Sequence, residues 1–200
     1  MRKMSAIRGA VHASAAAAAL AVTTIVSGAQ THGTPERFTA MAVNFDSQAG
    51  GAAGTVEFVV NRWSTDAERD KLMTALLEKG PDKLLDVLQS NPSVGYIQTP
   101  NSVGYDLRYA RRVPGEDGGE RISLVTDRPI AFWEASQQPR SLNYPFTVVE
   151  LRIGPDGKGE GKLSIATKIT ADSDNKTIFL ENYAIQPVML QNVRREPVRK

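Results

Sequence analysis

The chain has 200 residues, a formal charge of +2 at neutral pH, no cysteine and two histidines, His12 and His32. The lack of cysteine excludes disulfides, thiolate zinc sites, thiol nucleophiles and thioether-linked haem. With so few imidazoles we expect no transition-metal site, no cofactor and none of the histidine-based catalytic machineries.

Residues 1–29 have the three-part pattern of a secretory signal peptide. Three basic residues precede an alanine-rich apolar stretch, and Ser27-Gly28-Ala29 supplies the small residues of a cleavage site. We expect cleavage after Ala29 and export to the periplasm or the extracellular space, with no stable membrane insertion afterwards. The alternative for this segment is an uncleaved membrane anchor.

Removal of residues 1–29 changes the charge balance. The segment holds three positive charges and no negative one, so the formal charge falls from +2 to −1. Four basic residues cluster in 194–200, namely Arg194, Arg195, Arg199 and Lys200. We expect 194–200 to be a flexible basic tail and 30–36 to be a flexible N-terminus. Because nucleic-acid recognition needs a concentrated positive patch, we expect no nucleic-acid partner.

Two alternating runs follow the expected cleavage site. In Phe38–Phe45, one face of a strand holds Thr39, Met41, Val43 and Phe45, and we expect this strand to be half-buried. A second strand places Val56, Phe58 and Val60 on one face. The Gly- and Ala-rich stretch 48–54 lies between them, so we expect a hairpin with a long loop.

Residues 65–90 change to the helical period. Thr65 and Glu68 form the signature of a capping box, and Gly80 is a suitable stop for the helix that follows. Pro81 fits the first turn of a second helix. The leucines of both segments recur at helical spacing, which indicates core packing.

The strand period returns after Pro92. Ser-Val-Gly-Tyr occurs at 93–96 and at 102–105, which predicts two facing strand segments, the second placing Tyr105, Leu107 and Tyr109 on one face. Further strands are expected at 122–126, 146–153, 162–169 and 177–185, with a short edge strand at 188–193. We therefore expect one mainly β domain of the α+β class over 37–193. Its architecture is either an antiparallel meander sheet or a partly closed barrel, with an inserted two-helix hairpin at about 65–90.

Residues 126–134 leave a strand and combine charge with aromatic side chains. In one interpretation Arg128 anchors an anionic group, Phe132 and Trp133 form an apolar wall, and Glu134 adds a carboxylate. In the other, Trp133 fills one end of the sheet and Asp127-Arg128 is a structural turn.

Three phrases carry a family resemblance: Ser123–Ile130, Tyr144–Glu150 and Leu180–Tyr183. They resemble phrases of uncharacterised exported bacterial proteins that have a signal peptide and one β-rich domain. The resemblance spans most of residues 55–193. It implies a bacterial cell-envelope or extracellular setting and carries no catalytic residue.

Three classes of function remain open. We favour an exported non-catalytic domain that binds a small or extended ligand, or a protein partner of the envelope. A structural component of the cell envelope is the second. The third is a hydrolase that uses two carboxylates, for which Glu134 and Glu150 are the first candidates.

Overall fold

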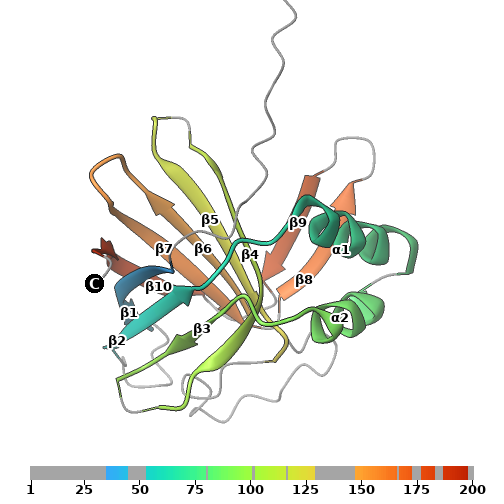
Figure 1. The fold of residues 1–200 in the computed structure, drawn as a ribbon, viewed down its shortest axis with the longest axis horizontal. Coiled ribbons are helices and arrows are strands. Elements are labelled where there is room, and N and C mark those ends of the chain that lie inside the picture. The colour runs from blue at the N-terminus through green and yellow to red at the C-terminus, as the bar shows by residue number, and fades with distance from the viewer. Residues whose placement is uncertain are drawn as a thin grey trace, which may run out of the picture.

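The computed structural model describes residues 35–44, 53–79, 81–100, 102–115, 117–128, 147–165, 167–172, 177–182 and 187–197. These residues form a closed antiparallel barrel of eight strands, in the order β1-β10-β7-β6-β5-β4-β3-β2 (Figure 1). The strands are β1 (Glu36–Val43), β2 (Ala53–Val60), β3 (Gly95–Gln98), β4 (Tyr105–Pro114), β5 (Glu120–Thr126), β6 (Thr147–Ile153), β7 (Lys158–Ile165) and β10 (Val188–Glu196).

The mainly β, α+β class is confirmed, but the sheet is neither a meander sheet nor a partly closed barrel. β1 pairs with β2 on one side and with β10 on the other, so the described barrel strands have no free edge. Closure removes the unpaired backbone groups that an edge strand would expose.

Strand β10 corrects the expected edge strand and the start of the expected tail. It lies between β1 and β7 and continues to Glu196, so Arg194, Arg195 and Glu196 belong to the barrel. Glu36, expected in a flexible N-terminus, is the first residue of β1.

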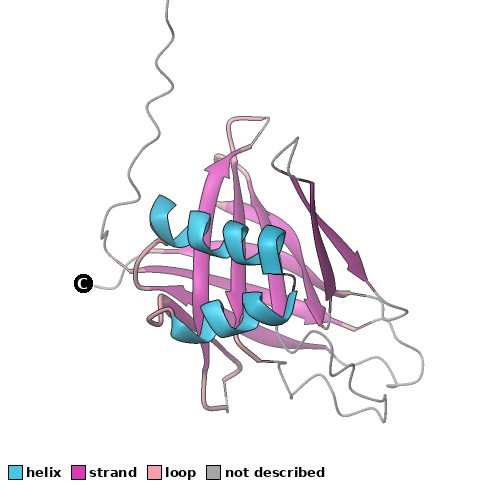
Figure 2. Cartoon of the chain, turned by 90° about the vertical axis from the view of Figure 1, so that its right-hand side faces the viewer, coloured by secondary structure: helices cyan, strands magenta, loops and turns pink. Residues whose placement is uncertain are grey.

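Two insertions interrupt the barrel. The helices α1 (Asp66–Lys79) and α2 (Pro81–Ser90) lie between β2 and β3, as expected. The hairpin of β8 (Thr167–Asp172) and β9 (Thr177–Asn182) lies between β7 and β10. Figure 2 shows both helices on one side of the barrel with this hairpin beside them. The single strand expected at 162–169 is therefore divided between β7 and β8.

The helices cover the outer face of β4, β5 and β6. Four leucines of α1 and α2 pack there with apolar side chains of the barrel wall: Leu72, Leu76, Leu84, Leu88, Tyr109, Val125 and Val148. Among the described residues, neither helix is long and apolar enough to cross a membrane.

The capping box predicted for α1 is confirmed. The Thr65 amide donates to Glu68 Oε2 at 2.8 Å, and the Glu68 amide donates to Thr65 Oγ1 at 3.2 Å. These two bonds satisfy donors that the first turn of a helix leaves without intrahelical partners.

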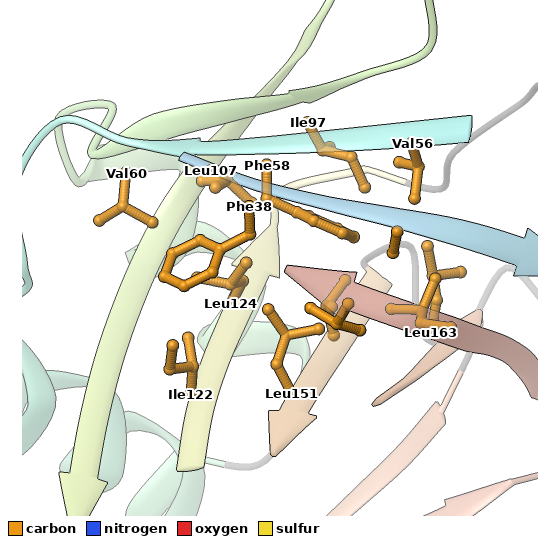
Figure 3. Close-up of a cluster of buried hydrophobic side chains, with 14 of the residues drawn as sticks. Phe38, Val56, Phe58, Val60, Ile97, Leu107, Ile122, Leu124, Leu151 and Leu163 are labelled. Carbon is orange, nitrogen blue, oxygen red and sulfur yellow. The ribbon is translucent and has the colours of Figure 1, made fainter. Parts of the chain in front are cut away.

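A second, larger core lies inside the barrel. Its side chains come from facing strands and point toward one another (Figure 3). The largest are completely buried: Phe38, Phe58, Ile97, Leu107, Ile122, Leu124, Leu151, Leu163 and Leu190.

Two details of strand orientation differ from the sequence expectation. In β1 the buried residues are Phe38, Ala40 and Ala42, whereas Met41 on the other face is 40% exposed. In β4 a register shift between Leu107 and Tyr109 turns Tyr109 outward, toward the helices. Such a bulge inserts an extra residue and reverses the alternation beyond it.

Candidate ligand-binding site

The barrel has two ends with different chemistry. We call the end at which β1 begins and β10 finishes the Trp63 end; it holds Glu36 and Arg195. We call the opposite end, at which β1 finishes and β6 begins, the Thr147 end. The strand registers place Val43 and Thr147 there.

A network of charged and aromatic side chains closes the Trp63 end. Trp63 is 4% exposed, and its indole Nε1 donates to Glu36 Oε1 at 3.0 Å. The Arg112 guanidinium lies 5.0 Å from the centre of the indole ring and donates to the same oxygen at 2.9 Å. This stacking adds a cation–π attraction to the ion pair.

Arg195, near the end of β10, extends this network. Its Nε lies 3.4 Å from Glu36 Oε2, as an ion pair without hydrogen-bond alignment, and its Nη2 bonds Glu120. Its guanidinium also lies 5.4 Å from the ring centre of Phe38. Carboxylates and guanidinium groups at this end therefore neutralise one another, which is the arrangement of a structural cap.

Along the wall formed by β1 and β2, the inward side chains become smaller toward the Thr147 end. Along β1 the inward residues decrease from Phe38 through Ala40 to Ala42. Their cross-strand partners on β2 decrease in the same direction, from Phe58 through Val56 to Gly54. Large rings thus fill one half of this wall, and a methyl group faces a glycine in the other half.

Two threonines add polar atoms to the interior at this end. Thr126 and Thr147 are both 0% exposed. In β5 Thr126 alternates with the core residue Leu124, and in β6 Thr147 alternates with the core residue Val149, so both side chains face inward.

The two hydroxyl groups have different partners. Thr126 Oγ1 accepts from the Thr147 amide at 3.0 Å and donates to the Arg128 carbonyl at 2.5 Å. Thr147 Oγ1 is buried and has no hydrogen-bond partner. A buried hydroxyl without a partner costs about 1–3 kcal/mol, so this group is available for a hydrogen bond that the protein itself does not supply.

Of the residues predicted to form a site, Arg128 alone lies within the described part of the chain; Phe132, Trp133 and Glu134 lie outside it. Arg128 follows β5 at the Thr147 end, and its side chain is 58% exposed. Its Nε lies 3.5 Å from Asp127, which also pairs with Arg108 at 3.1 Å. Arg108 also donates to the carbonyl of Asn91, which follows α2, so this ion-pair cluster lies on the outer side of the barrel.

Of the two carboxylates considered for hydrolysis, Glu150 lies within the described part of the chain. Glu150 lies between the inward residues Val149 and Leu151, so it faces outward, where it pairs with Lys162 Nζ at 2.7 Å. Glu134 lies outside the described residues. Within the part of the chain that the structure describes, no three Asp, Glu or His side chains gather in a group that could hold a metal ion.

Sequence reasoning placed Thr126 on a strand, and Thr147 too, without assigning either a role. A signal for both was present, because each occupies the inward position of an otherwise aliphatic alternating run: Ile122, Leu124 and Thr126 in one case, and Thr147, Val149 and Leu151 in the other. A polar residue in such a position marks a buried hydrogen-bonding group.

Comparison with known proteins gives no match: no family model, no curated protein and no solved structure matches this chain.

Proposed function

We propose that the protein binds a small apolar ligand inside the barrel, at the Thr147 end. The observation that carries this proposal is the decrease in side-chain size from the pair Phe38 and Phe58 to the pair Ala42 and Gly54. An eight-stranded barrel is just wide enough either to be filled by its own side chains or to hold one small ligand. The small inward residues of β1 and β2 at the Thr147 end favour a ligand there.

The contrast between the two barrel ends also supports a ligand site at the Thr147 end. At the Trp63 end, paired charges and a buried indole close the interior. At the Thr147 end, one of the two inward threonine hydroxyls of the described residues, that of Thr147, has no partner. Polar groups placed singly in an apolar interior are typical of ligand sites, where they fix the orientation of the ligand.

The proposal includes an extracytoplasmic setting. The basic and alanine-rich residues 1–29 support export of the domain through a cleaved signal peptide. A ligand-binding barrel of this kind would act as a non-catalytic binding protein of the cell envelope.

Titration with N-phenyl-1-naphthylamine, an uncharged dye that fluoresces in apolar surroundings, tests the proposal. We expect saturable binding with one dye molecule per chain. Ala42→Leu, which enlarges an inward side chain at the Thr147 end, should weaken binding by at least about tenfold, since a filled site leaves no room for the dye. Met41→Leu, on the outer face of the same strand, is the matched control and should leave binding unchanged.

Two results would contradict the proposal. Absence of saturable binding to the unaltered protein would exclude an apolar ligand site. Equal binding by the Ala42→Leu and Met41→Leu variants, both folded by circular dichroism, would place the dye outside the barrel interior.

A further inference from the structure

We infer that the ligand is uncharged and presents an oxygen atom, in the manner of an alcohol, ketone or ester, which accepts a hydrogen bond from Thr147 Oγ1. This inference rests on the proposed function and specifies the chemistry of the ligand. It starts from the one buried hydroxyl of the described barrel interior that the protein leaves without a partner.

Thr126 cannot serve as the ligand's partner in the same way. Its hydroxyl hydrogen is used in the bond to the Arg128 carbonyl, and its oxygen accepts the Thr147 amide. These bonds also tie the start of β6 to the end of β5. Thr126 therefore positions Thr147, whereas the Thr147 hydroxyl keeps its donor for another group.

Among the described residues, no charged side chain faces inward at this end, which argues against an anionic ligand. In the part of the chain that the structure describes, Arg108 and Arg128 are the cationic groups that pair with Asp127, the residue after Thr126, and both lie on the outer side of the barrel. Arg108 is further engaged by the Asn91 carbonyl at 3.2 Å. A carboxylate placed in the interior would be buried without a counter-ion, which is strongly unfavourable.

The inward apolar residues on the strands of the Thr147 end define the rest of the ligand. Val149, Leu124, Val188 and Ala42 offer only apolar surface, and all are buried. The ligand is therefore expected to have one oxygen-bearing end and an aliphatic or aromatic body.

Displacement of N-phenyl-1-naphthylamine by decan-1-ol and by decanoate tests the inference, because the two competitors share a chain and differ in charge. At neutral pH we expect decan-1-ol to displace the dye. The affinity for decanoate should be lower than that for decan-1-ol by at least about tenfold. Decanoate equal to or stronger than decan-1-ol would overturn the inference while leaving the proposed function intact. Failure of the dye itself to bind would instead be a failure of the proposed function.

Thr147→Val removes the hydroxyl and keeps the shape of the side chain. We expect it to weaken the binding of decan-1-ol by about fivefold, as the loss of one hydrogen bond predicts, with the affinity of the variant for the dye measured separately and used in the calculation. Because the lost hydroxyl has no partner, the melting temperature should stay the same or rise. Unchanged binding of decan-1-ol would overturn the inference.

Two further threonine variants separate binding from folding. Thr39→Val removes a hydroxyl that donates to Glu196 on the outer face. It should leave the affinity for decan-1-ol unchanged. Thr147→Ser keeps the hydroxyl and should retain decan-1-ol binding. If Thr147→Val failed to fold, loss of decan-1-ol binding in a folded Thr147→Ser variant would contradict the inference.

Discussion

Glu36 is the residue in which the polar contacts of the Trp63 end meet. Its carboxylate accepts the indole hydrogen of Trp63, binds Arg112 of β4 and faces Arg195 of β10. The side chain is 20% exposed, so solvent screens these contacts only in part. Without the negative charge of Glu36, Arg112 and Arg195 would lose the carboxylate that they share at this barrel end.

Glu36→Gln tests this role. The amide oxygen can still accept from Trp63, but the charge that neutralises Arg112 and Arg195 is lost. We expect the free energy of unfolding, measured by urea denaturation, to fall by about 2 kcal/mol, in the range of hydrogen bonds to charged groups. Glu57→Gln is the control. Its partner Arg37 is 45% exposed, so less than about 1 kcal/mol should be lost. Equal losses would contradict a special role for Glu36.

At the level of elements, the start of α1 is held by more than its capping box. Arg62 donates to both carboxylate oxygens of Glu68, at 2.8 and 3.0 Å. These hydrogen bonds, with a smaller contribution from the Thr65 amide, hold the pKa of Glu68 below its ordinary value. The last residues before the helix are thereby fixed to its first turn.

The lowered pKa of Glu68 makes the stability of the domain depend on pH. In the unfolded chain the pKa of a glutamate is about 4.3. In the folded protein the pKa of Glu68 lies below that value. The stabilisation is therefore complete above the unfolded pKa and is lost as the pH falls through the folded pKa. Glu68→Gln preserves the capping geometry and removes the titration. We expect its stability to fall less steeply with acid than that of the unaltered protein, in urea midpoints measured from neutral to acidic pH.

Thr65→Ala provides the matched comparison for this prediction. It removes the hydroxyl of the cap and keeps the pair of Arg62 with Glu68. We expect a loss of about 1 kcal/mol at neutral pH, with the acid dependence largely retained. Identical acid dependence in Glu68→Gln and the unaltered protein would show that this carboxylate does not contribute.

Strand periodicity predicted the position of β1 but not its inward face. Thr39, Met41 and Val43 carry the longer side chains on average, yet Ala40 and Ala42 are the residues that face the interior with Phe38. Alternation defines two faces and does not state which one is buried. That choice depends on the partner strands and on the width of the closed barrel, neither of which is local.

Helical elements were easier to predict because their signals are local. Thr65, Glu68 and Pro81 lie within one turn of the helix ends that they mark. The pairing of β5 with β6, in contrast, brings Thr126 to Thr147 across the intervening residues 127–146. Sequence alone could show two inward threonines, but only the pairing shows that one uses its hydroxyl and the other does not.

At the scale of the whole molecule, the barrel closes between strands from opposite ends of the described chain. Arg37 pairs with Glu196 and Val43 with Met189, so β1 and β10 are in register over most of their length. In β10 a register shift follows Leu190, and Asn192 has a φ of 51°. Beyond this bulge Val193 joins the barrel core and Arg195 reaches Glu36 and Glu120.

Truncation at the C-terminal end tests how much of the fold depends on this closure. A chain ending at Val193 lacks the last three residues of β10 and every contact of Arg195. The ladder to the start of β1 is then lost, and Phe38 loses its guanidinium cover. We expect the melting temperature to fall sharply or the domain to unfold, because the loss is several kcal/mol against a typical stability of about 5–15 kcal/mol.

A chain ending at Pro197 is the control, since it retains all of β10 and removes only residues 198–200. It should melt at the temperature of the full chain in circular dichroism. If residues 194–200 acted solely as a flexible basic tail, both truncated chains would match the full chain. A difference between them would assign the effect to the three residues of β10, because the shorter chain removes them and the longer one does not. Arg195→Met in the full chain then separates their two contributions: it removes the ion pairs and leaves the backbone ladder to β1 in place.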